Sequence, residues 1–233
     1  MQQNNAEINN FLNGAAHDTL DLVEEIGDAH ASTSIDTPLK PDAFLLSDEE
    51  KMDKIEAHFR VIMDTMGLDL TDDSLNGTPR RVAKMFVKEI FSGLDPKNKP
   101  SISLFENKFQ YNEMLVEKQI KLHSFCEHHF LPIIGYAHIA YIANGNVIGL
   151  SKLNRIVEYY AKRPQVQERL TIQIANELKK VLNTEDVAVY IEAKHMCVQM
   201  RGVEHNDSST VTTAYGGAFE NEQTRNEFLH AIK

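Results

Sequence analysis

IKLHSFCEHHFLP, residues 120–132, lies at the centre of the chain and is the segment from which its fold and its candidate site can be predicted. In residues 120–126, apolar or small side chains occupy every second position, which is the period of a β-strand with one buried face. The composition then changes, because one of the two cysteines and three of the ten histidines of the chain fall within residues 122–132. The segment therefore predicts a strand that ends in a dense group of metal-ligand and acid–base side chains.

Further strands are predicted on its C-terminal side. Residues 132–143 are rich in Ile, Tyr and Ala, and Asn144-Gly145 is a typical hairpin turn that leads into residues 147–150. Alternation returns in residues 187–197, which predicts a long strand. The Thr-, Ser- and Gly-rich residues 208–219 are a candidate for another strand, and a short helix is expected to end the chain.

Two helices are predicted between these strands. Ser151 is expected to cap the first helix, and Pro164 separates it from a second, longer helix. The apolar residues of both recur at helical spacing. They are Leu153, Ile156, Val157 and Tyr160 in the first helix, and Val166, Leu170, Ile174, Leu178 and Leu182 in the second.

Two more helices are predicted before the first strand. Residues 47–50 form a capping box, S-x-x-E, and Gly67 ends the helix that follows. The next helix is expected to begin with Thr78 as N-cap and Pro79 as its first residue, and to end at Gly93. We interpret the apolar side of each helix as core packing. The residues are Met52, Ile55, Phe59, Ile62 and Met66 in one helix, and Val82, Met85, Phe86 and Ile90 in the other.

This order of elements predicts an α+β fold with an antiparallel sheet. We expect residues 1–46 to be a variable, partly disordered segment, with a short helix near Phe11 to Ile26 and an extended linker at residues 37–41. A helical region, residues 47–115, then precedes the main domain, residues 116–233.

Composition narrows the classes of function. A hydrophobic content of 42% and a charged content of 25% over 233 residues are ordinary for a globular protein. A net charge of −10 argues against nucleic acid as a partner, although a local basic pocket could still hold a small anion. We expect no membrane span and no secretory signal. Two distant cysteines are not a disulfide framework and fit a reducing, cytoplasmic location.

The central segment contains half of a metal site. Cys126 and His129 form C-x-x-H, and Cys197 can supply a third ligand, which would leave one position open as in catalytic zinc sites. The alternative is that these are ordinary buried or surface residues. Two surplus histidines favour the catalytic interpretation, because His128 and His195 adjoin the ligands and titrate near neutrality.

A second cluster is suited to an anion. Ser151, Lys152 and Arg155 lie in the first turn of a predicted helix, where unpaired N–H groups and the helix dipole favour phosphate. The alternative is a solvated helical face. Arg81 is a weaker case of the same kind, and Arg201 would put another cation near the metal if the long strand continued to it.

Two further features are less specific. Gln167 and Glu168 could together hydrogen-bond the edge of a base such as guanine, although an exposed helix start is the simpler interpretation. Glu127, between a ligand and a surplus histidine, is expected to be a supporting or surface carboxylate.

Taken together, these motifs resemble the GTP cyclohydrolase I family, and its bacterial branch in particular. The resemblance covers roughly residues 47–232 in order. It is carried by TPRRVAKM at 78–85, CEHH at 126–129, GLSKLNR at 149–155, RPQVQERL at 163–170, HMC at 195–197 and RGV at 201–203.

The resemblance implies a tunnelling fold, in which two helices pack on an antiparallel four-stranded sheet. It also implies a homodecamer with active sites at subunit interfaces, Zn²⁺ as the metal and GTP as the substrate. By motif, the zinc ligands are Cys126, His129 and Cys197, and the catalytic residues are His128 and His195. The implied substrate-binding residues are Gln167 and Glu168 for guanine, and Ser151, Lys152, Arg155, Arg201 and Arg81 for the triphosphate.

The implied reaction is hydrolytic opening of the guanine ring at C8, release of formate and rearrangement to 7,8-dihydroneopterin triphosphate, the entry to folate-type pterins. A nitrile reductase or a zinc-independent cyclohydrolase on the same fold is a second hypothesis, and the cysteine pair argues against both. A silent zinc-stabilised assembly module is a third. Such a module would not need His128, His195 and Glu168, all of which are present.

Overall fold

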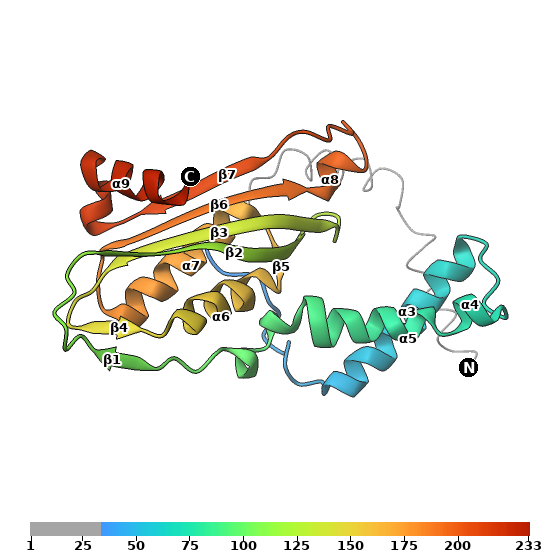
Figure 1. The fold of residues 1–233 in the computed structure, drawn as a ribbon. Coiled ribbons are helices and arrows are strands. Elements are labelled where there is room, and N and C mark those ends of the chain that lie inside the picture. The colour runs from blue at the N-terminus through green and yellow to red at the C-terminus, as the bar shows by residue number, and fades with distance from the viewer. Residues whose placement is uncertain (1–33) are drawn as a thin grey trace. The chain divides into compact units, whose positions relative to one another are not determined.

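The computed structural model describes residues 34–233, whose helices and strands have the mixed α+β architecture predicted from the sequence (Figure 1). The short helix expected near Phe11 to Ile26 lies outside the described residues. Within residues 34–233, no helix is both long and apolar enough to cross a membrane.

The main sheet has five strands in the order β5-β2-β3-β6-β7. Four of them run antiparallel, as expected, and the two-residue β5 pairs parallel with the end of β2. Their bounds are Met114–Cys126 for β2, Pro132–Ile142 for β3, Pro164–Gln165 for β5, Val187–His195 for β6 and Thr210–Tyr215 for β7.

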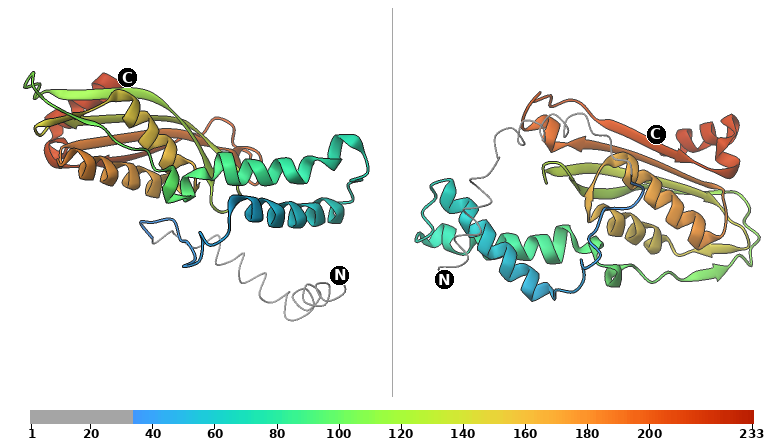
Figure 2. Two further views of the ribbon diagram at one scale, coloured as in Figure 1. Left: turned by 90° about the horizontal axis from the view of Figure 1, so that it is seen from below. Right: turned by 180° about the vertical axis from the view of Figure 1, so that it is seen from behind.

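Helices α6 (Leu150–Ala161) and α7 (Gln167–Leu182) cover one face of this sheet (Figures 1 and 2). The predicted apolar stripe of α7 is confirmed, because its members from Leu170 to Leu182 are fully buried. Helix α9 (Glu222–Ile232) and the 3₁₀ turn η4 (Gly217–Glu220) lie on the opposite face. Phe219 and Phe228 are fully buried there, edge to face.

The hairpin predicted at Asn144-Gly145 is wrong in its pairing. The chain does turn there, with Gly145 at a positive φ of 76°, but β4 (Asn146–Ile148) pairs with β1 (Leu104–Glu106) in a separate two-stranded sheet. The reason is that β2 and β6 already occupy both edges of β3.

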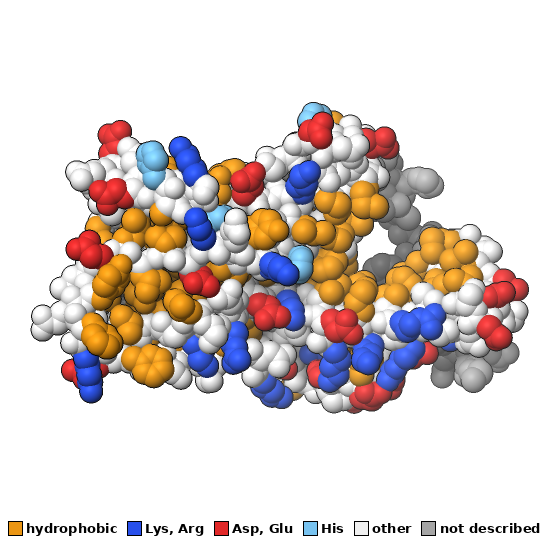
Figure 3. Space-filling model, viewed as in Figure 1, with side chains coloured by type: hydrophobic (Ala, Val, Ile, Leu, Met, Phe, Trp, Pro, Cys, Tyr) orange, Lys and Arg blue, Asp and Glu red, His pale blue; other side chains and the backbone are white. Residues whose placement is uncertain are grey.

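Helix α3 (Asp48–Thr65) begins with the predicted capping box, since Ser47 and Glu50 satisfy each other's backbone N–H groups. The core-packing interpretation of its apolar stripe is only partly correct. Met52 is buried, but Ile62 is 50% exposed and Met66 is 63% exposed. Helix α5 (Thr78–Lys84) and the π-helix after it cover only part of α3, so hydrophobic side chains stay on the surface over α3 (Figure 3).

Helix α5 (Thr78–Lys84) follows the short helix α4 (Asp73–Asn76) and continues as the π-helix η1 (Met85–Ile90). Its N-cap is Gly77 rather than Thr78, and Pro79 lies in its first turn. The side predicted to be buried is only half-buried. Two 3₁₀ turns, η2 (Ser92–Leu94) and η3 (Pro96–Asn98), then lead to β1.

Candidate metal centre and active site

A tight loop at the end of β2 carries three of the candidate groups, Cys126, His128 and His129. Its ends are fixed by two backbone hydrogen bonds, from the N–H of Cys126 to the Leu131 carbonyl at 2.8 Å and from the N–H of Phe130 to the Cys126 carbonyl at 2.9 Å. Phe130 has a φ of 53°, a left-handed conformation that is costly for a non-glycine residue. We call residues 126–130 the ligand loop.

Cys197 reaches the ligand loop from a short helix. The strand expected to run through residue 197 ends at His195, and Cys197 lies in α8 (Met196–Gln199) instead. The ligand atoms of Cys126, His129 and Cys197 nevertheless all lie within 4.8 Å of one another. The Cys126 Sγ and His129 Nδ1 atoms are 3.8 Å apart.

This group fits a tetrahedral metal ion. Zinc bonds of about 2.3 Å to sulfur and about 2.0 Å to nitrogen put neighbouring ligand atoms about 3.5–3.8 Å apart. Burial, together with the adjacent Cys126 thiol, raises the pKa of Cys197 to about 11. Without a cation the Cys197 thiol therefore stays protonated near neutral pH, and a bound cation would favour its thiolate form. The group could therefore bind a metal ion.

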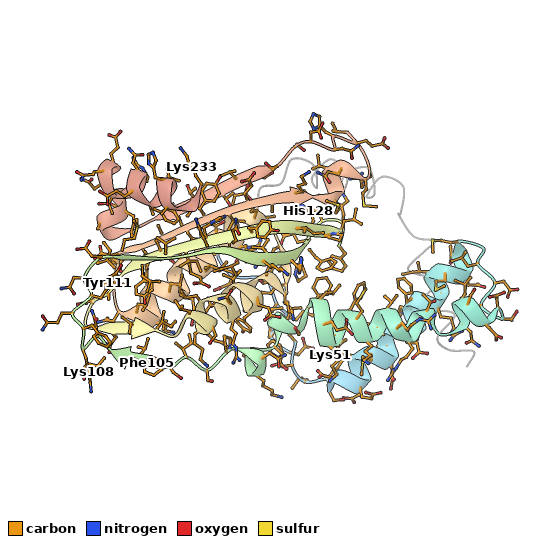
Figure 4. The ribbon with its side chains drawn as sticks, viewed as in Figure 1. Lys51, Phe105, Lys108, Tyr111, His128 and Lys233 are labelled. Carbon is orange, nitrogen blue, oxygen red and sulfur yellow. The ribbon has the colours of Figure 1, made fainter. Side chains whose placement is uncertain are left out.

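One surplus histidine, His128, lies beside this group, and the other, His195, is the N-cap of α8, which carries Cys197. The Nδ1 atom of His128 is 3.7 Å from Cys126 Sγ, and its side chain is 47% exposed. Figure 4 shows His128 at the end of the sheet near α8. His195 is partly buried, which lowers its pKa, and its Nε2 lies 2.8 Å from Gln167 Oε1.

Gln167 is placed differently from the sequence-based expectation. It is only 1% exposed, and its Nε2 donates to the Thr210 carbonyl at 2.9 Å and to Thr212 Oγ1 at 3.1 Å. The amide expected at a guanine edge is thus engaged inside the chain, where it supports His195. Glu168, the next residue, remains exposed.

Arg201 brings a cation to the metal group, as expected, although no strand continues to it. Its Nη1 lies 2.8 Å from His129 Nε2 and must be the donor, because guanidinium has no acceptor.

The anion cluster lies elsewhere in the chain. Ser151 is in the first turn of α6 but does not cap it, because the N-cap is Gly149. Lys152 Nζ donates to the Ser101 carbonyl at 2.7 Å, and the side chain of Arg155 is exposed. Arg81 donates within its own helical region, to the Ser74 carbonyl and Thr78 Oγ1.

The start of α6 is far from the ligand loop within one chain. Asn154 donates to Glu117 Oε1 at 3.1 Å, which fixes this end of α6 beside the first half of β2. From Glu117 to Cys126, a strand rising about 3.3 Å per residue spans roughly 30 Å. The structure therefore does not bring Ser151, Lys152 and Arg155 to the metal group of the same chain.

Sequence reasoning assigned no role to Arg169, which contacts the ligand loop. This arginine is 6% exposed and forms an ion pair with Glu127. A faint signal existed, because Arg169, Gln173 and Glu177 repeat every four residues beside the apolar stripe of α7, and all three are buried. Such a pattern more often marks a solvated face of a helix, so the sequence alone did not distinguish a solvated face from a row of buried polar residues.

Fold and site together define an α+β protein with a Cys-His-Cys group that could bind a metal ion and two further histidines, His128 and His195. The family profile described as GTP cyclohydrolase I matches residues 55–233. The chain is 61% identical over 213 residues to GTP cyclohydrolase 1 of Flavobacterium johnsoniae, covering 91% of this chain and 96% of that one. It is 54% identical over 200 residues to GTP cyclohydrolase 1 of Aeromonas salmonicida, covering 85% and 91%.

The chain therefore belongs to the GTP cyclohydrolase I family, and the resemblance seen in its sequence is confirmed. A solved structure of the archaeosine synthase QueF-Like in the apo form is a more distant match. Its TM-score is 0.38 at 17% identity, over 45% of this chain and 94% of that one, and we draw no conclusion from it.

Proposed function

We propose that this chain is a GTP cyclohydrolase I. It would open the imidazole ring of GTP at C8, release formate and form 7,8-dihydroneopterin triphosphate, the first step of tetrahydrofolate and pterin synthesis. The observation that carries the proposal is the group of Cys126, His129 and Cys197 ligand atoms within 4.8 Å of one another, with His128 beside it and His195 at the N-cap of the helix that carries Cys197.

Zn²⁺ is the proposed metal. Two thiolates and an imidazole suit zinc, and three protein ligands leave a fourth position for water. When bound, zinc supplies activated water at neutral pH, because it lowers the pKa of a coordinated water molecule to about 7. Cys126, His129 and Cys197 would hold it.

His128 is the proposed proton donor to the imidazole nitrogen of the substrate, because its ring is both exposed and next to the metal group. Gln167 would fix which ring nitrogen of His195 carries the proton. The amide nitrogen of Gln167 donates to backbone and hydroxyl oxygens, so its oxygen faces His195 and accepts from Nε2. In the neutral ring, Nδ1 is then the acceptor.

Glu168 is the proposed anchor for the guanine end of the substrate. Its carboxylate is exposed at the first turn of α7 and can accept two N–H donors from one base edge. Gln167, whose amide is engaged, would contribute to this end by holding His195 and the start of α7.

The residues that bind the triphosphate of GTP are proposed to come from another copy of the chain. Ser151, Lys152 and Arg155 are too far from their own metal group to share one GTP molecule with it. An active site at a subunit interface, in a homodecamer of the tunnelling fold, resolves this distance. Arg201 would face the triphosphate from the metal side, and Arg81 is the most peripheral of the proposed contacts.

In this proposal residues 116–233 are the catalytic domain, residues 47–115 the helical region and residues 1–46 a variable segment. A cytoplasmic location is proposed because both cysteines are free thiols and would need a reducing compartment to stay so.

The test is incubation of the purified protein with GTP, followed by oxidation, pterin fluorescence and a formate assay, with and without a chelator. We expect equal amounts of formate and pterin, both abolished by the chelator and restored by Zn²⁺. Metal binding without any turnover would favour the silent assembly module. Reduction of a nitrile by NADPH without release of formate would favour the reductase.

A further inference from the structure

The first turn of α7 touches the ligand loop through a buried two-pronged contact. Arg169 Nη1 donates to Glu127 Oε2 at 2.5 Å, and Arg169 Nη2 donates to Glu127 Oε1 at 3.2 Å. The Arg169 side chain is only 4% exposed and that of Glu127 is 20% exposed. This geometry fixes both the position and the rotation of the carboxylate, which a single hydrogen bond would not do.

Glu127 lies between two residues of the proposed site, Cys126 and His128. Its backbone N–H donates to the Gln165 carbonyl at 3.0 Å, and its Oε1 is 3.9 Å from His128 Nε2. A fixed Glu127 side chain therefore constrains the ligand loop near its start. The loop also contains Phe130 at a left-handed φ, a conformation that needs such external constraint to persist.

The guanidinium itself is held from a third side. Arg169 Nε donates to the Ser34 carbonyl at 3.0 Å, and one turn further along α7 Gln173 Nε2 donates to the Ile35 carbonyl at 2.9 Å. The segment 34–35 thus lies across α7 and helps to orient the arginine. A lysine could keep the charge but could not make the fork and the Nε contact together.

We propose that Arg169 is a positioning residue of the active site. It acts through the carboxylate of Glu127, which holds the ligand loop so that Cys126, His128 and His129 meet Cys197 in a fixed geometry. The inference rests on the proposed function for its effect on turnover. Its effect on the metal group depends only on the contacts within this chain.

The experiment uses the full-length protein loaded with Co²⁺ in place of Zn²⁺, because thiolate-bound Co²⁺ has visible absorption bands that report ligand geometry. The variants are Arg169→Lys, Glu127→Gln and the double variant. Glu177→Gln is the matched control, because this α7 carboxylate is also buried and ion-paired, with Lys99 Nζ at 2.7 Å, yet it does not contact the ligand loop. Thermal unfolding is followed for every variant.

For Arg169→Lys we expect shifted Co²⁺ bands and a metal affinity lower by about 10–100-fold, the range typical of residues that orient metal ligands. GTP turnover should show kcat lower by at least about tenfold, with KM changed by less than about threefold. Glu127→Gln should show the same pattern. The double variant should be no worse than the poorer single variant, because both changes break one contact.

The proposal is overturned if Arg169→Lys matches Glu177→Gln, with a lower melting temperature but wild-type Co²⁺ bands, metal affinity and kcat. It is also overturned if the two single effects add in the double variant. Failure of the proposed function would show separately, as no GTP turnover by the wild-type protein. The Co²⁺ bands and the metal affinity would still decide the role of Arg169.

Discussion

The two ends of the sheet carry the candidate functional groups and differ in how far one chain completes them. At the ligand loop, Gln167 and Arg169 are buried and bonded to His195 and Glu127, so the groups are set within the chain. At the start of α6, Ser151 and Arg155 are exposed, and Lys152 contacts only a backbone carbonyl among the contacts described. The groups at one end are thus held by contacts within the chain, whereas the other end is a basic surface that a second chain would complete in the proposed interface site.

This difference predicts different consequences of mutation. Changes around the ligand loop should alter metal content, chemistry or folding, because buried groups there lose their partners. Changes at the start of α6 should alter the binding of substrate and leave metal content and stability almost unchanged, because exposed charges contribute little to folding.

The largest effect is expected for Cys197→Ser. Loss of one thiolate should remove zinc, and with it several kcal/mol of transition-state stabilisation, so turnover should fall by about 10⁴-fold or more. Zinc is measured by atomic absorption after dialysis. Cys197 would not be a ligand if the variant kept one zinc per chain.

His128→Ala should separate chemistry from metal binding at the same end of the sheet. We expect zinc to be retained and formate release to fall by about 10³-fold, within the range of general acid–base catalysis. The matched control is His205→Ala, a histidine in the exposed turn after α8. Turnover at the wild-type rate in His128→Ala would disprove the proposed proton transfer.

The sequence predicted the local part of the Cys126, His129 and Cys197 group better than its distant member, Cys197. Cys126 and His129 are three residues apart, so their proximity follows from the spacing alone. Cys197 was predicted to share a strand face with His195, but the strand ends at His195 and a helical turn presents the thiol instead. Nothing in residues 196–199 signals that turn, because a four-residue helix needs no capping or periodic pattern.

Long-range pairing and side-chain partners explain the other differences. The turn at Asn144-Gly145 was recognised, but its strand pairs with β1 because β3 has no free edge, which only the assembled sheet reveals. The engagement of Gln167 and the Glu127–Arg169 contact also depend on residues far apart in sequence. By contrast, the stripe of α7 and the capping box of α3 are local patterns, and both were predicted correctly.

Glu168→Ala should have the next effect, at the boundary between the two ends. Loss of a charged acceptor for two N–H donors should lower kcat/KM for GTP by about 10²-fold, mostly through KM. Zinc content and the melting temperature should match the wild type, because the carboxylate is exposed. An unchanged KM in steady-state kinetics would remove Glu168 from the guanine site.

The smallest single effect is expected for Lys152→Ala, because Arg155, the other cation at the start of α6, remains. Removal of one charge-assisted contact to phosphate should raise KM for GTP by about tenfold. Metal content should be unchanged. Glu158→Ala, further along the exposed side of α6, is the control for a change in the helix itself.

Mixing variants then tests whether the two ends belong to different chains. The Lys152→Ala, Arg155→Ala double variant and the Cys197→Ser variant are each expected to be nearly inactive. If every site takes its metal end from one chain and its phosphate end from another, random mixed oligomers formed by refolding together should have about a quarter of their sites intact. Sites built within one chain would regain no activity on mixing, because each chain would still carry its own defect. Recovered activity near a quarter of wild type would therefore show that the metal end and the phosphate end of one site come from different chains. No recovery in verified mixed oligomers would exclude such shared sites.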